Sequence, residues 1–145
     1  MLWGGVPAIL KGWFDRVLAH GFAYADGRRY EHGYFKSKRG ILGITTGGTL
    51  QRSPAGGSYG EMNSVLHGVQ HRMLEYLGLD TVPPFVAYAA PRVDDVERET
   101  YLKEWRRKLM NATLDEEWLR NLRRGSLSVE PISAGELSGG WGRKN

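Results

Sequence analysis

The sequence predicts an α/β fold in which helices pack against a parallel β-sheet. Two features support this class. Apolar residues recur at helical spacing in three long segments, and two short runs of β-forming residues separate those segments. The resulting order is helix, strand, helix, strand, helix, and such alternation is typical of α/β folds with a parallel sheet. The 145 residues, 41% hydrophobic and 25% charged, suit one ordinary globular domain.

The first helix is expected from Pro7 to about His20. Pro7 follows two glycines and suits the first position of a helix, where its missing amide hydrogen costs nothing. The expected apolar stripe consists of Ile9, Leu10, Trp13, Phe14, Val17 and Leu18. An aromatic-rich loop follows over residues 21–38. Its rings either pack as local core or line a pocket for a planar substrate.

The first strand is expected over residues 40–45, and it runs into Thr45-Thr46-Gly47-Gly48. Glycine lets the backbone approach another group closely. Open α/β sheets bind ligands outside the carboxyl ends of their strands. The stretch is therefore either an ordinary β-turn or a strand end that presents bare backbone to a flat or anionic ligand.

The second helix is expected from Glu61 to Tyr76, with Gly78 as its stop. Its inner face should carry Val65, Leu66, Val69, Met73, Leu74 and Leu77. The second strand is expected over residues 82–89, with Pro83-Pro84 at its entry, and should be a parallel neighbour of the first strand.

A third helix should be capped by Asp94 or Asp95 and turn Leu102, Trp105 and Leu109 inward. Residues 113–116 (Thr-Leu-Asp-Glu) predict a capping box that opens a short fourth helix ending at Gly125. The domain is thus expected over residues 1–125, with an irregular tail over 126–145. Two strands are too few for a stable doubly wound sheet, so either the chain is a fragment or another chain completes its sheet.

Composition narrows the function classes. The chain has no cysteine, which excludes disulfides and thiol chemistry and favours a reducing, cytoplasmic compartment. The net charge of +4 comes with arginines that alternate with acids, so no nucleic-acid partner is expected. No stretch has the length and apolarity of a membrane span or the form of a signal peptide.

Three motif interpretations are disfavoured. Residues 56–60 match Gly-x-Ser-x-Gly but lack the preceding strand that a hydrolase nucleophile needs. His67 and His71 share a helix face without a third ligand, so we expect a surface pair and no metal. Glycine-rich phosphate-binding motifs are absent as well.

Four segments together resemble one family. They are residues 2–17 (LWGGVPAILKGWFDRV), 21–24 (GFAY), 44–48 (ITTGG) and 60–63 (GEMN). The family is that of the NAD(P)H:quinone oxidoreductases of the DT-diaphorase type. The resemblance extends to about residue 110 and implies the C-terminal half of a flavodoxin-like, doubly wound fold, with the N-terminal strands missing. It also implies a homodimer that binds FAD (FMN being possible), takes a hydride from NAD(P)H and passes two electrons to a quinone.

The same resemblance assigns site residues. Those expected at the flavin are Leu2, Trp3, Gly4, Gly5, Thr45, Thr46, Gly47, Gly48 and Arg98. Those expected at the quinone are Tyr24, Ala25 and Asp26. Ser53 and Tyr59 stand where the family places a catalytic tyrosine and histidine. Tyr59 can donate a hydrogen bond, but a phenol of pKa near ~10 relays protons less well than an imidazole near ~6.5.

Two alternatives stay open. One is an FMN-dependent azo- or nitroreductase of the same fold. The other is a non-catalytic regulatory or dimerisation module, which the departure at Ser53 and Tyr59 favours. In either case we expect the 145-residue chain alone to hold FAD weakly and to be marginally soluble or oligomeric, because apolar surface is uncovered and no phosphate cradle is present.

Overall fold

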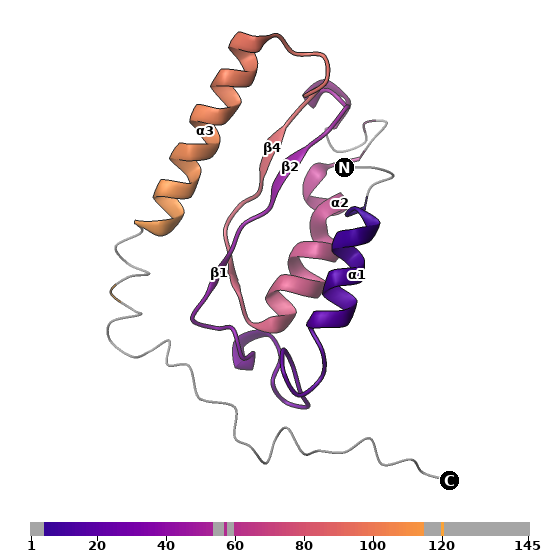
Figure 1. The fold of residues 1–145 in the computed structure, drawn as a ribbon, viewed down its shortest axis with the longest axis vertical. Helices are drawn as coiled ribbons and strands as arrows, with labels where there is room; N and C mark the ends of the chain where they lie inside the picture. The colour runs from indigo at the N-terminus through magenta and orange to yellow at the C-terminus, as the bar shows by residue number, and fades with distance from the viewer. Residues whose placement is uncertain (1–4, 54–56, 58–59, 115–119, 121–145) are drawn as a thin grey trace.

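Helices lie on both sides of a narrow parallel sheet (Figure 1). The computed structural model describes residues 5–53, 57, 60–114 and 120. On one side of the strands lie α1 (Ala8–Val17) and α2 (Met62–Val69), and on the other lies α3 (Asp95–Thr113). This arrangement confirms the α/β class and the expected order of the main elements.

The sheet consists of two parallel strand pairs. β1 (Arg39–Gly40) pairs with β3 (Asp80–Thr81), and β2 (Gly43–Thr45) pairs with β4 (Phe85–Ala87). The expectation that the two strand regions are parallel neighbours is confirmed. The expectation of two unbroken strands over 40–45 and 82–89 is wrong.

Two prolines explain the break. Between the pairs Gly40↔Thr81 and Gly43↔Phe85, two residues on one side face three on the other. Pro83 and Pro84 are among those three, and proline has no amide hydrogen to donate to a ladder. The pairing stops there and resumes one residue out of step, where the Phe85 amide donates to the Leu42 carbonyl over 2.8 Å.

α1 is shorter than the expected 7–20. Pro7 is its N-cap rather than its first helical residue, and the Pro7 carbonyl accepts a hydrogen bond from the Lys11 amide. Most of the apolar stripe is exposed among the described residues, with Ile9 87% exposed and Trp13 51% exposed. None of the described helices combines the length and apolarity needed to cross a membrane.

The second helix changes its winding along its length. α2 continues into a π-helical segment, η3 (Gln70–Leu74), and a 3₁₀ turn, η4 (Glu75–Leu77). Gly78 ends it in the left-handed conformation, with φ of 93°, which confirms the predicted stop. The loop that contains η1 (Tyr30–His32) packs on this end, where the Phe35 amide donates to the Leu77 carbonyl over 3.0 Å.

The buried apolar core is small. Among the described residues, its members are Ala23, Leu66, Leu77 and Ala87. Leu66 and Leu77 come from the predicted inner face of the second helix, and Ala87 ends β4. The core therefore sits between α2, its continuation and the strands.

Aromatic contacts and hydrogen bonds attach α3 to the strands and the segments that follow them. The Trp105 ring lies 5.4 Å from that of Phe85. The Tyr101 hydroxyl donates to the Tyr88 carbonyl over 3.0 Å, and burial of that hydroxyl raises its pKa. Arg39 reaches the other end of the helix, donating to the Ala112 carbonyl at 2.8 Å and to Asp80 at 3.0 Å.

Two expectations about this helix are corrected. Trp105 does face the sheet, but Leu102 and Leu109 are 68% and 37% exposed, because α3 stands over a hollow instead of a filled layer. Thr113 is the last residue of α3 and not the start of a capping box, since its hydroxyl donates back to the Leu109 carbonyl at 2.7 Å. Asp94 caps α3 as predicted, accepting from the Glu97 amide. The expected fourth helix lies largely outside the described residues.

We predict that Gly33→Ala destabilises the chain by about 1–3 kcal/mol or more. A methyl group on Gly33 would overlap the backbone of Leu77 and Gly78, so either the loop or η4 has to move. Gly12→Ala is the matched control: Gly12 lies inside α1 with open space around it, and alanine there should stabilise by about 0.5–1 kcal/mol. Urea unfolding of both variants measures the difference. Equal midpoints for the two variants would contradict the packing of this loop on Leu77.

Candidate functional site

The candidate site begins where β2 and β4 end. After β2, the chain forms a turn over residues 46–48, and after β4 it forms a loop over residues 88–92. Three backbone hydrogen bonds join them: Thr46 amide to Ala87 carbonyl (3.0 Å), Ala90 amide to Thr46 carbonyl (3.0 Å) and Ala89 amide to Gly48 carbonyl (2.8 Å). The turn is therefore held in place at the carboxyl edge of the sheet, where open α/β folds bind ligands.

The 46–48 turn presents backbone rather than side chains. The Thr46 hydroxyl oxygen accepts a hydrogen bond from the Gly48 amide at 3.0 Å and so closes the turn on itself. Gly47 is exposed, and its amide donates to no acceptor in the described part of the chain. The turn thus offers an unused backbone donor and carries no bulky side chain of its own.

The 88–92 loop carries backbone strain next to this turn. Ala89 has φ of 49°, in the left-handed region that non-glycine residues seldom adopt. The Ala89 carbonyl accepts from the Arg92 amide at 2.7 Å, and the Ala89 amide is bonded to Gly48. Such a conformation costs on the order of 1–3 kcal/mol and persists where surrounding contacts impose it.

An apolar hollow of 430 Å³ lies between the strand pair and α3. Its lining includes Thr45, Ala90 and Arg98 at the carboxyl edge and extends along the strands to Gly43 and Trp105. Residues 46–48 are not part of this lining, so the turn lies next to the hollow and not inside it. The structure thus brings Arg98 close to Thr45, and the Arg98 guanidinium pairs with Asp95 at 2.7 Å.

Ser53 lies on the other side of the strands from α3. It is 6% exposed, and its hydroxyl donates to the Thr49 carbonyl at 3.3 Å. A 390 Å³ pocket beside it is lined also by Glu61, Pro84 and Tyr88. Of the other predicted site residues, Gly5 precedes α1, whereas Leu2, Trp3, Gly4 and Tyr59 lie outside the described residues, as do Gly56 and Ser58 of the Gly-x-Ser-x-Gly motif.

The loop over residues 21–38, to which Tyr24, Ala25 and Asp26 belong, lies at the opposite end of the strands (Figure 1). The Tyr24 ring packs 5.5 Å from the rings of both His20 and Tyr76. Ala25 forms a bridge with Arg28, and Asp26 pairs with Arg29 at 2.9 Å. Within one chain, the structure does not bring these residues to the 46–48 turn. Tyr24 is half-buried against Tyr76, and the loop forms no pocket beside that turn within the described residues.

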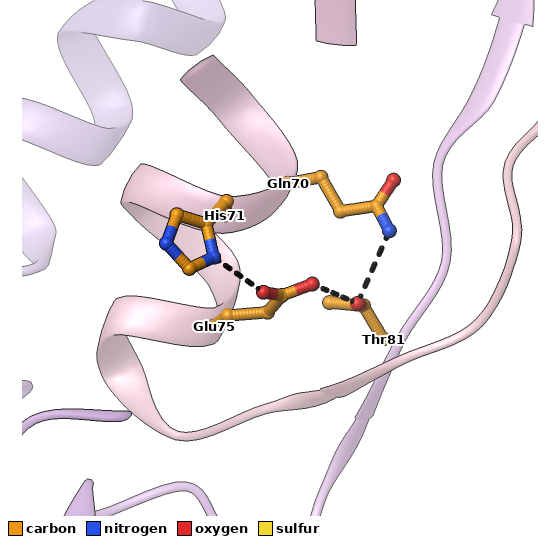
Figure 2. Close-up of polar contacts among 4 residues, drawn as sticks. All are labelled: Gln70, His71, Glu75 and Thr81. Carbon is orange, nitrogen blue, oxygen red and sulfur yellow. Dashed lines mark hydrogen bonds and ion pairs between the residues drawn. The ribbon is translucent and has the colours of Figure 1, made fainter. Parts of the chain in front are cut away.

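A polar cluster links the second helix to β3 (Figure 2). The Thr81 hydroxyl donates to Glu75, the Gln70 amide group donates to the Thr81 hydroxyl oxygen at 3.2 Å, and His71 Nδ1 lies 2.7 Å from Glu75 Oε2. The hydrogen bond from Thr81 is the main cause that lowers the pKa of Glu75. No sequence motif marks this cluster; the only local signal is the spacing of four between His71 and Glu75. His71 is thus engaged by Glu75, in addition to stacking on His67 at 4.9 Å.

Comparison with known proteins identifies a family and several relatives that are similar to this sequence. The family model described as flavodoxin-like fold matches residues 1–109. NAD(P)H dehydrogenase [quinone] 1 of Rattus norvegicus is 38% identical over 109 residues, which are 75% of this chain and 40% of the rat protein. Ribosyldihydronicotinamide dehydrogenase [quinone] of Mus musculus is 34% identical over 116 residues, 80% of this chain and 50% of the mouse protein.

A solved structure agrees with these matches. A Klebsiella pneumoniae protein assigned as a quinone reductase superposes with a TM-score of 0.71 at 34% identity, over 76% of this chain and 46% of that one. The chain therefore spans half or less of the length of these relatives.

We predict that Glu75→Gln destabilises the chain by about 1 kcal/mol at neutral pH, a value discounted for partial exposure. Because folding lowers the pKa of Glu75, its ionised form stabilises the native state above the ordinary pKa of 4.5. That contribution is lost as the pH falls through the lowered value. The difference from the parent chain should therefore shrink on acidification from about pH 7 to about pH 3.

The control is Glu99→Gln, which removes an exposed pair with Lys103. It should change stability little at either pH. Denaturant unfolding at the two pH values is the measurement. A difference for Glu75→Gln that grows at low pH would reverse the assigned sign.

Proposed function

The chain belongs to the family of the flavodoxin-like fold, and on this basis we propose that it serves flavin-dependent reduction of a quinone by NAD(P)H. The observation that carries the proposal is the unused Gly47 amide on the side-chain-poor 46–48 turn, at the carboxyl edge of two parallel strands. The names of the rat and mouse relatives support the choice of NAD(P)H-type donor and quinone acceptor.

The residues of the turn fit an isoalloxazine ring. The ring is flat and apolar on its faces, with carbonyl oxygens and nitrogens along one edge. A turn without bulky side chains lets such an edge approach, and the Gly47 amide can donate to it. Bound there, the flavin would supply the redox chemistry, accepting a hydride from NAD(P)H and delivering two electrons to the quinone.

The chain's own contribution is to orient that donor. The hydrogen bonds from Ala89 and Ala90 to the turn prevent it from rotating, and the Thr46 hydroxyl holds Gly48. A donor fixed in advance costs no reorganisation when charge develops on a bound ring. Thr45 and Arg98, at the end of the apolar hollow, are proposed as further contacts to the same cofactor.

Proton supply is assigned to Tyr59 more than to Ser53. The Ser53 hydroxyl is buried and already donates to the Thr49 carbonyl, so Ser53 is proposed to position the loop that leads to Tyr59. This arrangement also favours a second candidate, a non-catalytic module of the same fold. Flavin binding without NAD(P)H oxidation would identify that alternative.

Homodimerisation and the cofactor's identity complete the proposal. The exposed apolar residues of α1, with Ile9 and Trp13 prominent, support a second copy as partner. FAD is the proposed flavin and FMN the alternative. Tyr24, Ala25 and Asp26 remain proposed quinone contacts, although the loop that carries them lies at the other end of the strands from the 46–48 turn of their own chain.

A segment exchange tests the proposal. Residues 1–109 replace the matched 109 residues of the rat relative, and the chimera is assayed for bound flavin absorbance and for NADPH-dependent quinone reduction. We expect both to be retained. In the same chimera, Gly47→Val should weaken flavin binding by about tenfold or more, because a branched side chain blocks the approach to the turn.

Gly12→Ala in the chimera is the control, since Gly12 lies in α1 with open space around it. It should leave both readouts unchanged. A folded chimera that binds no flavin would refute the proposed function. One that binds flavin but oxidises no NADPH would favour the non-catalytic module.

A further inference from the structure

Arg92 lies beside the 46–48 turn, and no acidic side chain of the described residues pairs with it. Its Nη2 atom is 4.0 Å from the position that a Cβ on Gly47 would occupy, so the guanidinium borders the exposed face of the turn. Arg92 is exposed, and its guanidinium forms no hydrogen bond or ion pair with the described residues. By contrast, Arg29, Arg39 and Arg98 each pair with an aspartate.

The backbone directs this side chain toward the turn. The Arg92 amide donates to the carbonyl of Ala89, whose left-handed conformation reverses the chain. The Ala89 amide in turn bonds to Gly48. Ala89 therefore connects Arg92 to the turn through its two backbone hydrogen bonds. These bonds are the surrounding contacts that hold Ala89 in its strained conformation.

The carboxylates that follow Arg92 in the chain are already engaged. Asp94 accepts from the Glu97 amide as the cap of α3, and Asp95 pairs with Arg98. The positive charge of Arg92 is thus left for an anion from outside the described residues. Guanidinium binds phosphate through paired, charge-assisted hydrogen bonds.

We propose that Arg92 binds a phosphate group of the ligand whose flat ring contacts the 46–48 turn. The placement of the ring rests on the proposed function, but the phosphate contact depends only on Arg92. The 145 residues contain no glycine-rich phosphate motif, so within them a charged side chain is the available means of recognising a phosphate. The phosphate can belong to the flavin or to the nicotinamide dinucleotide.

The test uses the 145-residue chain, labelled with ¹⁵N, and ligand pairs that differ only in phosphate. Riboflavin is compared with FMN, and adenosine with 2′,5′-ADP, following the amide resonances of Gly47 and Gly48. Arg92→Gln removes the charge but keeps most of the length. Arg107→Gln, an exposed position within α3, is the control.

We expect the parent and the Arg107→Gln chain to bind at least one phosphate-bearing ligand about tenfold more tightly than its phosphate-free counterpart. Arg92→Gln should abolish that preference and leave riboflavin binding unchanged. Loss of the FMN preference assigns the phosphate to the flavin, and loss of the 2′,5′-ADP preference assigns it to the dinucleotide.

The failures of the two proposals are distinguishable. If riboflavin binds but Arg92→Gln alters neither preference, the phosphate proposal is overturned and the flavin proposal stands. If no flavin binds, the pair of 2′,5′-ADP and adenosine still decides the role of Arg92. If the parent chain shows no preference for either phosphate-bearing ligand, the phosphate proposal is overturned as well.

Discussion

The parallel pairing of β2 with β4 is the constraint on which the candidate site depends. Parallel strands end at the same edge of a sheet, so the segments that follow Thr45 and Ala87 meet there, although about 40 residues separate them. The ladder continues beyond the strands through hydrogen bonds from Thr46, Ala89 and Ala90. This continuation converts two loops into one rigid unit and leaves the Gly47 amide on its outer face. A change of register would separate the turn from the loop that supports it.

The rest of the described structure stabilises this edge with little apolar burial. The four buried apolar residues are small in number for an α/β domain, and α3 contacts the sheet at Trp105 and Tyr101 while Leu102 stays exposed. Directional contacts therefore matter more than usual, such as the hydrogen bonds from Arg39 to Asp80 and Ala112. The relatives are at least twice as long as the matched part of this chain, and the exposed faces of α1 and α3 are consistent with further packing partners. The free energy of unfolding is a small difference between large terms, so leaving the apolar faces of α1 and α3 exposed lowers it by a large fraction.

The two proposals assign different kinds of recognition to neighbouring groups. The 46–48 turn offers backbone and no bulk, which suits a planar ring, whereas Arg92 borders it with a positive charge, which suits an anionic extension of the same ligand. Ala89 links the turn to Arg92. Its amide bonds to Gly48, its carbonyl accepts from the Arg92 amide, and its backbone is in the left-handed conformation. The aromatic loop around Tyr24 belongs to the opposite end of the strands and packs on Tyr76. Its proposed role at the quinone would therefore require a 46–48 turn from another chain.

The sequence by itself determined the local and the familial features. Caps and stops act within a few residues, so Asp94 and Gly78 could be identified from residue type and spacing alone. The alternation of apolar periods predicted the α/β order, and the blocks around residues 2–17 and 44–48 indicated the family. Only the tertiary structure decided that Pro83 and Pro84 split both strands, that Tyr24 lies away from the turn, and that Arg92 borders Gly47. These features depend on the register between distant segments and on the left-handed backbone of Ala89. Neither leaves a periodic or compositional signal in the chain, because both arise from contacts that form only when the two strands pair.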